Sequence, residues 1–347
     1  MTKQIQKGGD NSTNIQAGEV HVIQGITYTE ARTIALDVFK SNFLSMSEQA
    51  ATIARNRAEE ITEQFLRKLQ SEHEKGVQNA QDPDFQHALF TVQKEYARTG
   101  DKQLGDLLVD LLVDRTKHDK RSILQIVLNE SLSVAPKLTT DQLAVLSTVF
   151  ILRYTINYGI KSLDTLSKYL DTYISPFSDL LSKNAACYQH LEYAGCGSIS
   201  IGEVNLGELL RNKYAGVFSK GFDVGELQSR QINIAPTSEI FTVCLHDKNK
   251  LQVNSMSEQV LRDKARELNL SEEETNKLVG LNNSYMMNAN EIRQYLSILR
   301  PYMEKIFDVW GSSYMRNLKL TSVGIAIGHA NVKRQIGEFT DLSIWIN

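Results

Sequence analysis

Apolar residues recur at every third or fourth position along most of the chain, which is the period of a helix packed on one side. The clearest stripe lies opposite charged side chains and consists of Ala50, Ala54, Ala58, Ile61, Phe65 and Leu69. The same period predicts further helices at 84–98, 102–117, 119–134, 139–158, 162–183, 256–268, 272–281 and 289–309, with a kink at Pro301 in the last. The chain is therefore predicted to be mainly α-helical.

Capping boxes mark the start of two predicted helices. In this motif a hydroxyl and a carboxylate three residues apart satisfy each other's backbone amides. Thr27 and Glu30 form the first box, and Ser45 and Glu48 form the second. A helix that begins near Tyr28 would pack one apolar stripe against the rest of the protein. This stripe consists of Ala31, Ile34, Ala35 and Val38.

Short stretches with a two-residue period predict a few strands. Ile240–Leu245 and Leu251–Val253 flank a turn, and apolar residues alternate with others in Asp341–Asn347. We expect this last segment to join a sheet, because a terminal strand needs a partner. The predicted fold class is mainly α, a multi-helix body with a small α/β portion and an N-terminal β arm.

The first 27 residues differ from the rest, because they are rich in Gly, Asn, Gln and β-branched residues. A short repeat runs through them: Ile5-Gln6-Lys7-Gly8 is echoed by Ile15-Gln16-Ala17-Gly18 and by Ile23-Gln24-Gly25. Turn-forming residues separate the first two copies. We predict three parts of the chain: an N-terminal β arm at 1–27, a helical domain at 28–185 and an α+β domain at 186–347.

The arm resembles the RIP homotypic interaction motif and its bacterial amyloid-signalling relatives, whose core is a β-branched residue, Gln, an aliphatic residue and Gly. Ile15, Gln16 and Gly18 match this core, whereas Ala17 stands where a larger aliphatic residue is usual. Stacked strands of this composition form ladders through Gln and Asn side chains. The resemblance implies an interaction site at Ile5, Asn11, Asn14, Ile15, Gln16, Gly18, Val20, Val22, Ile23 and Gln24. The alternative is an ordinary hairpin or edge strand that docks on the body or on a neighbouring subunit.

The whole chain also resembles an uncharacterised bacterial family. Its members open on a G-x-N-S-x-N-I-Q-A-G segment and close on a segment similar to Ile336–Ile346. Related architectures occur near phage-defence genes, so the resemblance implies a role in antiviral defence. The family supplies no catalytic residues to transfer to this chain.

Composition narrows the class of protein. A hydrophobic content of 41% and a charged content of 23% are near globular averages, which excludes wholesale disorder. The net charge of −3 disfavours nucleic acid as a partner, and we expect weak binding to duplex DNA. Met1 is not followed by an apolar signal segment, and Leu143–Ile156 is short of the roughly 20 apolar residues that span a bilayer. An odd number of cysteines favours free thiols, so we predict a soluble cytoplasmic protein.

Two stretches resemble pieces of a winged-helix domain. Leu191–Gly197 followed by Ser198–Ile201 is typical of a helix that enters a short strand, and Leu320–Gly324 resembles the L-T-x-x-G turn of such domains. The pieces are far apart in the chain, and we find no basic recognition helix between them. A winged-helix-like nucleic-acid-binding protein is therefore the second functional hypothesis.

Residues able to bind metal or to catalyse show no recognised arrangement. The ligand types of a zinc site occur at Cys187, His190, Cys196, Cys244 and His246, but without the paired spacing of such sites, so we assign no metal.

Carboxylates repeat every four residues at Asp106, Asp110 and Asp114, and we interpret them as a solvated stripe opposite buried leucines. His329 has no nucleophile motif such as G-x-S-x-G and is interpreted as structural. The glycines of Gly195–Gly202 fit no nucleotide-binding pattern. We assign no catalytic residue and no cofactor.

The leading functional hypothesis is a self-associating interaction protein. It would form a homo-oligomer, or recruit an adaptor protein, through its N-terminal arm. The third hypothesis, after the winged-helix hypothesis, is a hydrolase or nuclease. Its site residues would be too dispersed along the chain to be recognised from the sequence.

Overall fold

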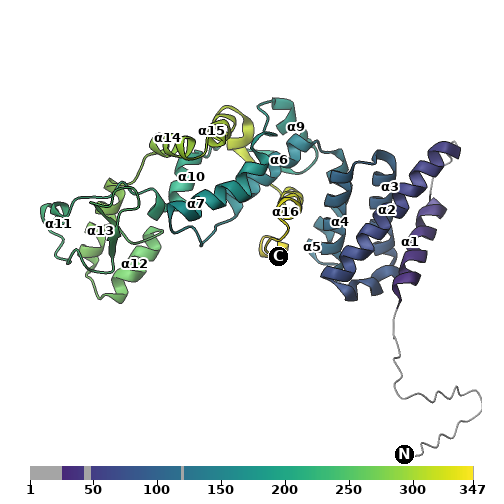
Figure 1. The fold of residues 1–347 in the computed structure, drawn as a ribbon, viewed down its shortest axis with the longest axis horizontal. Helices are drawn as coiled ribbons and strands as arrows, with labels where there is room; N and C mark the ends of the chain where they lie inside the picture. The colour runs from purple at the N-terminus through teal and green to yellow at the C-terminus, as the bar shows by residue number, and fades with distance from the viewer. Residues whose placement is uncertain (1–25, 43–47, 119–120, 347) are drawn as a thin grey trace, which may run out of the picture.

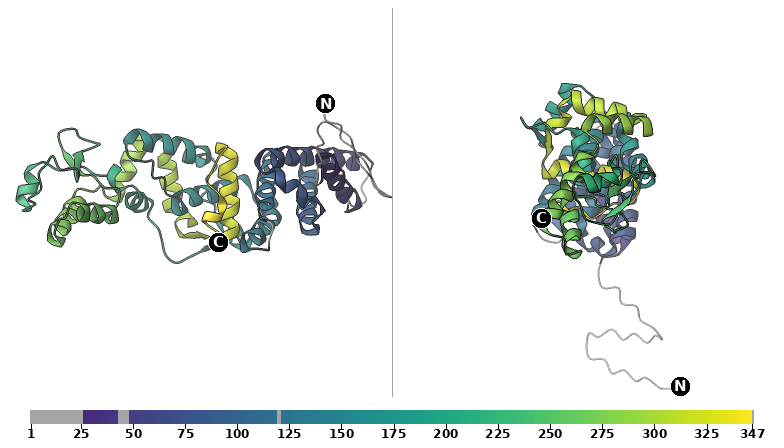
Figure 2. Two further views of the ribbon diagram at one scale, coloured as in Figure 1. Left: turned by 90° about the horizontal axis from the view of Figure 1, so that it is seen from below. Right: turned by 90° about the vertical axis from the view of Figure 1, so that its left-hand side faces the viewer.

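The computed structural model describes residues 26–42, 48–118 and 121–346. Over these ranges the protein is mainly helical and has only small antiparallel sheets, which confirms the predicted fold class of the body. Figures 1 and 2 show an elongated arrangement, with the N-terminal helices at one end and residues 222–285 at the other. None of the helices in these ranges combines the length and apolar character needed to cross a bilayer.

The first α-helices form a bundle at one end of the molecule (Figure 1). The predicted box of Thr27 and Glu30 begins the first helix, since each side chain accepts a hydrogen bond from the other residue's amide. The second predicted box includes Ser45, which lies outside the described residues. Gly100 ends the third helix with a φ of 64°. The bundle consists of α1 (Tyr28–Asn42), α2 (Glu48–Glu72), the 3₁₀ helix η1 (Glu74–Gln81), α3 (Pro83–Thr99), α4 (Lys102–Thr116) and α5 (Ile123–Val134).

The core of the bundle uses the predicted stripe of α2. Phe65 is fully buried, and its ring centroid lies 5.9 Å from that of Phe85 on α3. On α1 the buried side differs slightly from the expected stripe, because Ile34 and Val38 are only half buried. The fully buried residues of α1 are Ala31, Ala35, Leu36 and Phe39.

The middle of the chain contains two helices that are shorter than predicted, and each includes a π-helical turn. The predicted helix 139–158 ends at 154, and the predicted helix 162–183 ends at 178. A π turn adds a residue to the turn and so disturbs the 3.6-residue period on which the prediction rests. The elements are η2 (Ala135–Lys137), α6 (Thr140–Val149), the π helix η3 (Phe150–Tyr154), α7 (Leu163–Tyr169), the π helix η4 (Leu170–Ile174), α8 (Ser175–Ser178), α9 (Ala185–Tyr193), β1 (Gly197–Ile199), α10 (Leu206–Lys213) and η5 (Ala215–Val217).

Residues 219–287 form an inserted module with a hydrophobic core of its own. The two ends of the module lie side by side, because Ser219 and Met286 form an antiparallel bridge. Its predicted strands at 240–245 and 251–253 pair as a hairpin, in which Phe241 faces Val253. The elements are α11 (Gly225–Ser229), β2 (Phe241–Val243), β3 (Leu251–Val253), α12 (Glu258–Glu267) and α13 (Glu272–Ser284).

The C-terminal part departs from the prediction at two places. The predicted kinked helix 289–309 is two helices, because Arg300 before Pro301 adopts an extended conformation with φ −143° and ψ 102°. The predicted terminal strand is instead a 3₁₀ turn, so it joins no sheet within the described residues. The elements are α14 (Ala289–Leu299), α15 (Tyr302–Ser312), η6 (Tyr314–Asn317), β4 (Leu318–Leu320), α16 (Ser322–Ile336) and η7 (Leu342–Ile344).

Helix α16 joins the bundle to the middle part of the chain. It packs against α4 and α5 of the bundle and against α6 of the middle part, and Figure 1 shows it between these two regions. Every residue from Val323 to Val332 is buried. One continuous core therefore runs from the bundle into the C-terminal part. The division of the body at 185/186 stays a prediction.

Candidate functional site

The predicted interaction residues of the arm, from Ile5 to Gln24, lie outside the described residues. Their role therefore stays a prediction. The first described residue, Ile26, donates its backbone amide to Oε1 of Gln78 at 3.1 Å and packs against the edge of the core. The described part of the body thus begins beside η1.

The cysteines and histidines considered as metal ligands form no cluster able to hold a metal ion in the described part of the chain. His246 donates from Nε2 to the carbonyl of Val217 at 2.7 Å, and its neighbour Cys244 is buried in the same region. Burial raises the pKa of Cys187 to about 11 and that of Cys196 to about 12. Both thiols therefore stay protonated at neutral pH, which disfavours thiolate chemistry.

The two pieces that resemble a winged-helix domain meet in space, although they are far apart in the sequence. Strand β1 pairs with β4, and Gly197 faces Leu320. Thr321 then begins α16 by accepting a hydrogen bond from the amide of Gly324. However, α16 is buried along most of its length. It therefore cannot present a face to the major groove as a recognition helix does.

The structure contradicts the prediction for the carboxylates of α4. They were expected to form a solvated stripe, but Asp110 is 1% exposed and Asp114 is 7% exposed. Only Asp106 is half buried, and it accepts a hydrogen bond from Gln64 of α2. The expectation fails because α2 and α16 cover the side of α4 that was taken to face solvent.

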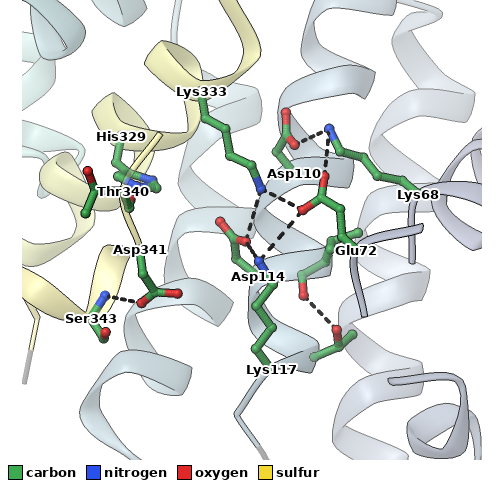
Figure 3. A network of polar contacts seen from close by, with 12 residues as sticks. Lys68, Glu72, Asp110, Asp114, Lys117, His329, Lys333, Thr340, Asp341 and Ser343 are labelled. Atoms are coloured by element: carbon green, nitrogen blue, oxygen red, sulfur yellow. Dashed lines mark hydrogen bonds and ion pairs between the residues drawn. The ribbon is translucent and has the colours of Figure 1, made fainter. Parts of the chain in front are cut away.

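Lysines from three segments surround these buried carboxylates (Figure 3). Lys68 of α2 forms an ion pair with Asp110, and Lys117 at the end of α4 contacts Oδ1 of Asp114 at 2.6 Å. Lys333 of α16 lies between two carboxylates, 2.8 Å from Oε2 of Glu72 and 3.4 Å from Oδ1 of Asp114. We call this cluster the latch, and it consists of Lys68, Glu72, Asp110, Asp114, Lys117 and Lys333.

The electrostatics of the latch depend on burial and on its balance of charge. Burial raises the pKa of Asp110, and the nearby ammonium of Lys68 opposes this shift without cancelling it. Burial by itself would lower the pKa of Lys333, but Asp114 and Glu72 outweigh it and hold that pKa above its usual value. Lys333 therefore stays charged at neutral pH and binds both carboxylates.

The latch connects elements that are far apart in the chain. Glu72 belongs to α2, Asp114 to α4 and Lys333 to α16, so one ammonium group joins the beginning of the body to its end. Each lysine of the latch is paired with a carboxylate, which neutralises the charge that is taken out of water. The arrangement can hold α16 in place. We assign it a positioning role.

Replacing Lys333 by methionine should lower the free energy of unfolding by about 2 kcal/mol, since it removes one of the two latch lysines that contact both Glu72 and Asp114, the other being Lys117. This is less than for a fully buried pair, because Glu72 is partly exposed. Chemical denaturation checks the value. Lys168→Met removes an exposed pair with Asp164 and is the matched control, for which we expect no measurable change. Equal stability of the two variants would show that the latch does not hold α16.

One sequence signal could have indicated that α4 is buried. Apolar residues occupy every position between its aspartates, namely Leu107, Leu108, Val109, Leu111, Leu112 and Val113. A helix that is apolar on nearly all sides is buried on more than one of them. No comparable signal marks Lys333 as the partner, because its distance from Asp114 in the chain is 219 residues.

Comparisons with known proteins identify a family and no individual relative. The model of an uncharacterised protein family matches residues 25–346. Curated protein sequences and solved structures give no match to the chain. The family match begins at residue 25, and the first residue that the structure describes is Ile26.

Proposed function

We propose that this chain, which belongs to the uncharacterised protein family whose model spans residues 25–346, is an assembly protein that self-associates through its N-terminal arm. The helical body serves as the carrier of the arm. Its family resemblance, with related architectures near phage-defence genes, suggests antiviral defence as the setting. The partner is a second copy of this chain or an adaptor with a similar motif.

The observation that carries the proposal is the way in which the body begins. Ile26 is tied to Gln78, and Thr27 and Glu30 cap α1. From there the described residues build a continuous core of their own. The Gln and β-branched composition of residues 1–25 suits strand pairing with another chain.

Deleting residues 1–25 should leave a folded body that has lost its higher-order assembly. The truncation begins at Ile26 because Ile26 and Thr27 contact the body. We expect unchanged helicity by circular dichroism, and a fall in the mass measured by light scattering to that of one chain. Loss of helicity would instead show that the arm is a strand of the core.

Point variants of the full chain separate the motif from the rest of the arm. Ile15→Asp should abolish assembly, because stacked copies would bring like charges together. Thr13→Asp is the matched control, since it adds the same charge outside the Ile-Gln-Ala-Gly core and should weaken assembly less. An assembly that survives both the truncation and Ile15→Asp would refute self-association through the arm. Phage challenge of cells that carry each variant tests the defence setting.

A further inference from the structure

The segment after α16, residues 338–346, folds back onto the helix, and we call it the C-terminal strap. Two side chains hold it in place. The indole Nε1 of Trp345 donates to the carbonyl of Tyr154 at 2.8 Å. His329 of α16 donates from Nε2 to the carbonyl of Thr340 at 2.6 Å. The strap is thus fixed to α16 at one point and to the end of η3 at another.

Aromatic rings form the contact surface beneath the strap. The ring of Trp345 lies 5.0 Å from that of Phe150 and is stacked on Phe339 at 6.0 Å. His329 lies among these rings, within 5.9 Å of each. Gly337 joins the strap to α16 with a φ of 89°, in the left-handed region that favours glycine. The strap therefore has a hinge at one end, and it packs against aromatic rings along its length.

The imidazole of His329 is buried with one nitrogen unsatisfied. The residue is 2% exposed, and its Nδ1 has no hydrogen-bond partner among the described residues. Because Nε2 donates to a carbonyl, Nδ1 carries a lone pair in the neutral ring. Protonation would place an N–H at Nδ1 among aromatic rings, where it has no acceptor. A buried donor without an acceptor destabilises the closed strap, and a charged donor destabilises it more.

Charged groups on α4, on α16 and on the strap act on this ring. Burial lowers the pKa of His329, while the hydrogen bond to Thr340 and the charge of Asp114 on α4 oppose it. Lys333 on α16 lowers this pKa further, and Asp341 on the strap raises it. The net pKa lies below the usual 6.5, so burial decides the direction. The ring is neutral at neutral pH while the strap is closed.

We propose that protonation of His329 opens the C-terminal strap and uncovers the aromatic surface around Phe150. When the strap is open, water reaches the imidazole, and its pKa returns towards 6.5. The closed strap is fully stable above that pH. It loses stability as the pH falls below 6.5 towards the lowered pKa of the closed state, because only the open state binds the proton readily.

Opening of the strap is separate from release of the latch. Lys333 lies one turn beyond His329 on α16 and remains bound to Glu72 and Asp114. Protonation of Asp110 would affect its pair with Lys68, which is on the other side of the latch. The strap can therefore open on its hinge while α16 stays in the core.

The test uses fluorine NMR of the full chain labelled with 5-fluorotryptophan. The chain has two tryptophans, so each gives one resonance, and Trp345→Phe assigns them. Lowering the pH from about 7.5 to about 5 should move the Trp345 resonance to the position of solvent-exposed fluorotryptophan. The resonance of Trp310, which is 1% exposed, should stay in place and report an intact body.

Variants of histidine complete the experiment. His329→Gln keeps an amide donor for the carbonyl of Thr340 but cannot titrate. His329→Phe keeps an aromatic ring at this position and cannot titrate either. Both should abolish the movement of Trp345 over this pH range. His246→Gln is the matched control, because it removes another histidine bonded to a backbone carbonyl, and it should titrate like the wild type. The proposal is overturned by a Trp345 resonance that does not move, by a joint movement of both tryptophans, or by unchanged titration in both His329 variants.

Discussion

Replacing Phe65 by aspartate is expected to unfold the N-terminal bundle. Phe65 is fully buried on α2 and meets Phe85 of α3 across the core. Removing a buried phenylalanine side chain costs about 3–5 kcal/mol. A carboxylate at the same place adds the cost of taking a charge out of water. The sum is a large part of the roughly 5–15 kcal/mol that stabilises a domain.

Thermal melts followed by circular dichroism measure this loss. Ile53→Asp is the matched control, because Ile53 lies on the same helix but is 48% exposed. It makes a similar chemical change at a surface position, for which we expect a change within about 0.5 kcal/mol. Similar melting temperatures for the two variants would mean that the assigned phase of α2 is wrong.

Replacing Gly324 by alanine is expected to cost about 3 kcal/mol or more, although it adds a single methyl group. A Cβ at this position would lie 1.8 Å from the backbone oxygen of Cys196. That oxygen cannot move freely, because it accepts a hydrogen bond from the amide of Thr321. The clash would therefore push the first turn of α16 away from β1.

Chemical denaturation compares this variant with Gly311→Ala. A Cβ at Gly311, which lies in α15, would meet no atom within 4 Å. Alanine favours the helix there by up to about 1 kcal/mol, so the control should be neutral or slightly stabilising. A harmless Gly324→Ala would show that α16 does not approach β1 as closely as described.

The consequences of a disturbed α16 should reach both the latch and the C-terminal strap. This helix carries Lys333 of the latch and His329 beneath the strap. Loss of its position through Gly324→Ala should therefore expose Trp345 at neutral pH, where the wild type keeps the strap closed. The same fluorine resonance that reports on acid opening records this effect.

Elements that depend only on neighbouring residues could be predicted from the sequence. The stripe that contains Phe65 predicts α2, because a helix packed on one side repeats its buried positions every 3.6 residues. Thr27 and Glu30 predict the start of α1, because the capping box closes within three residues. In such cases the partners of a residue are its neighbours in the chain, so their pattern can be read directly.

Which helix faces are covered, and by which segments, could not be predicted from local patterns. Asp110 repeats like a surface residue, yet α2 and α16 bury it. Leu342 and Ile346 follow a strand-like alternation, yet residues 342–344 form a 3₁₀ turn and both side chains are buried without a sheet. Gly197 of β1 pairs with Leu320 of β4, which is more than a hundred residues away in the chain. Burial depends on the packing of segments that are distant in the chain. Local periodicity does not indicate which of these segments covers a given face.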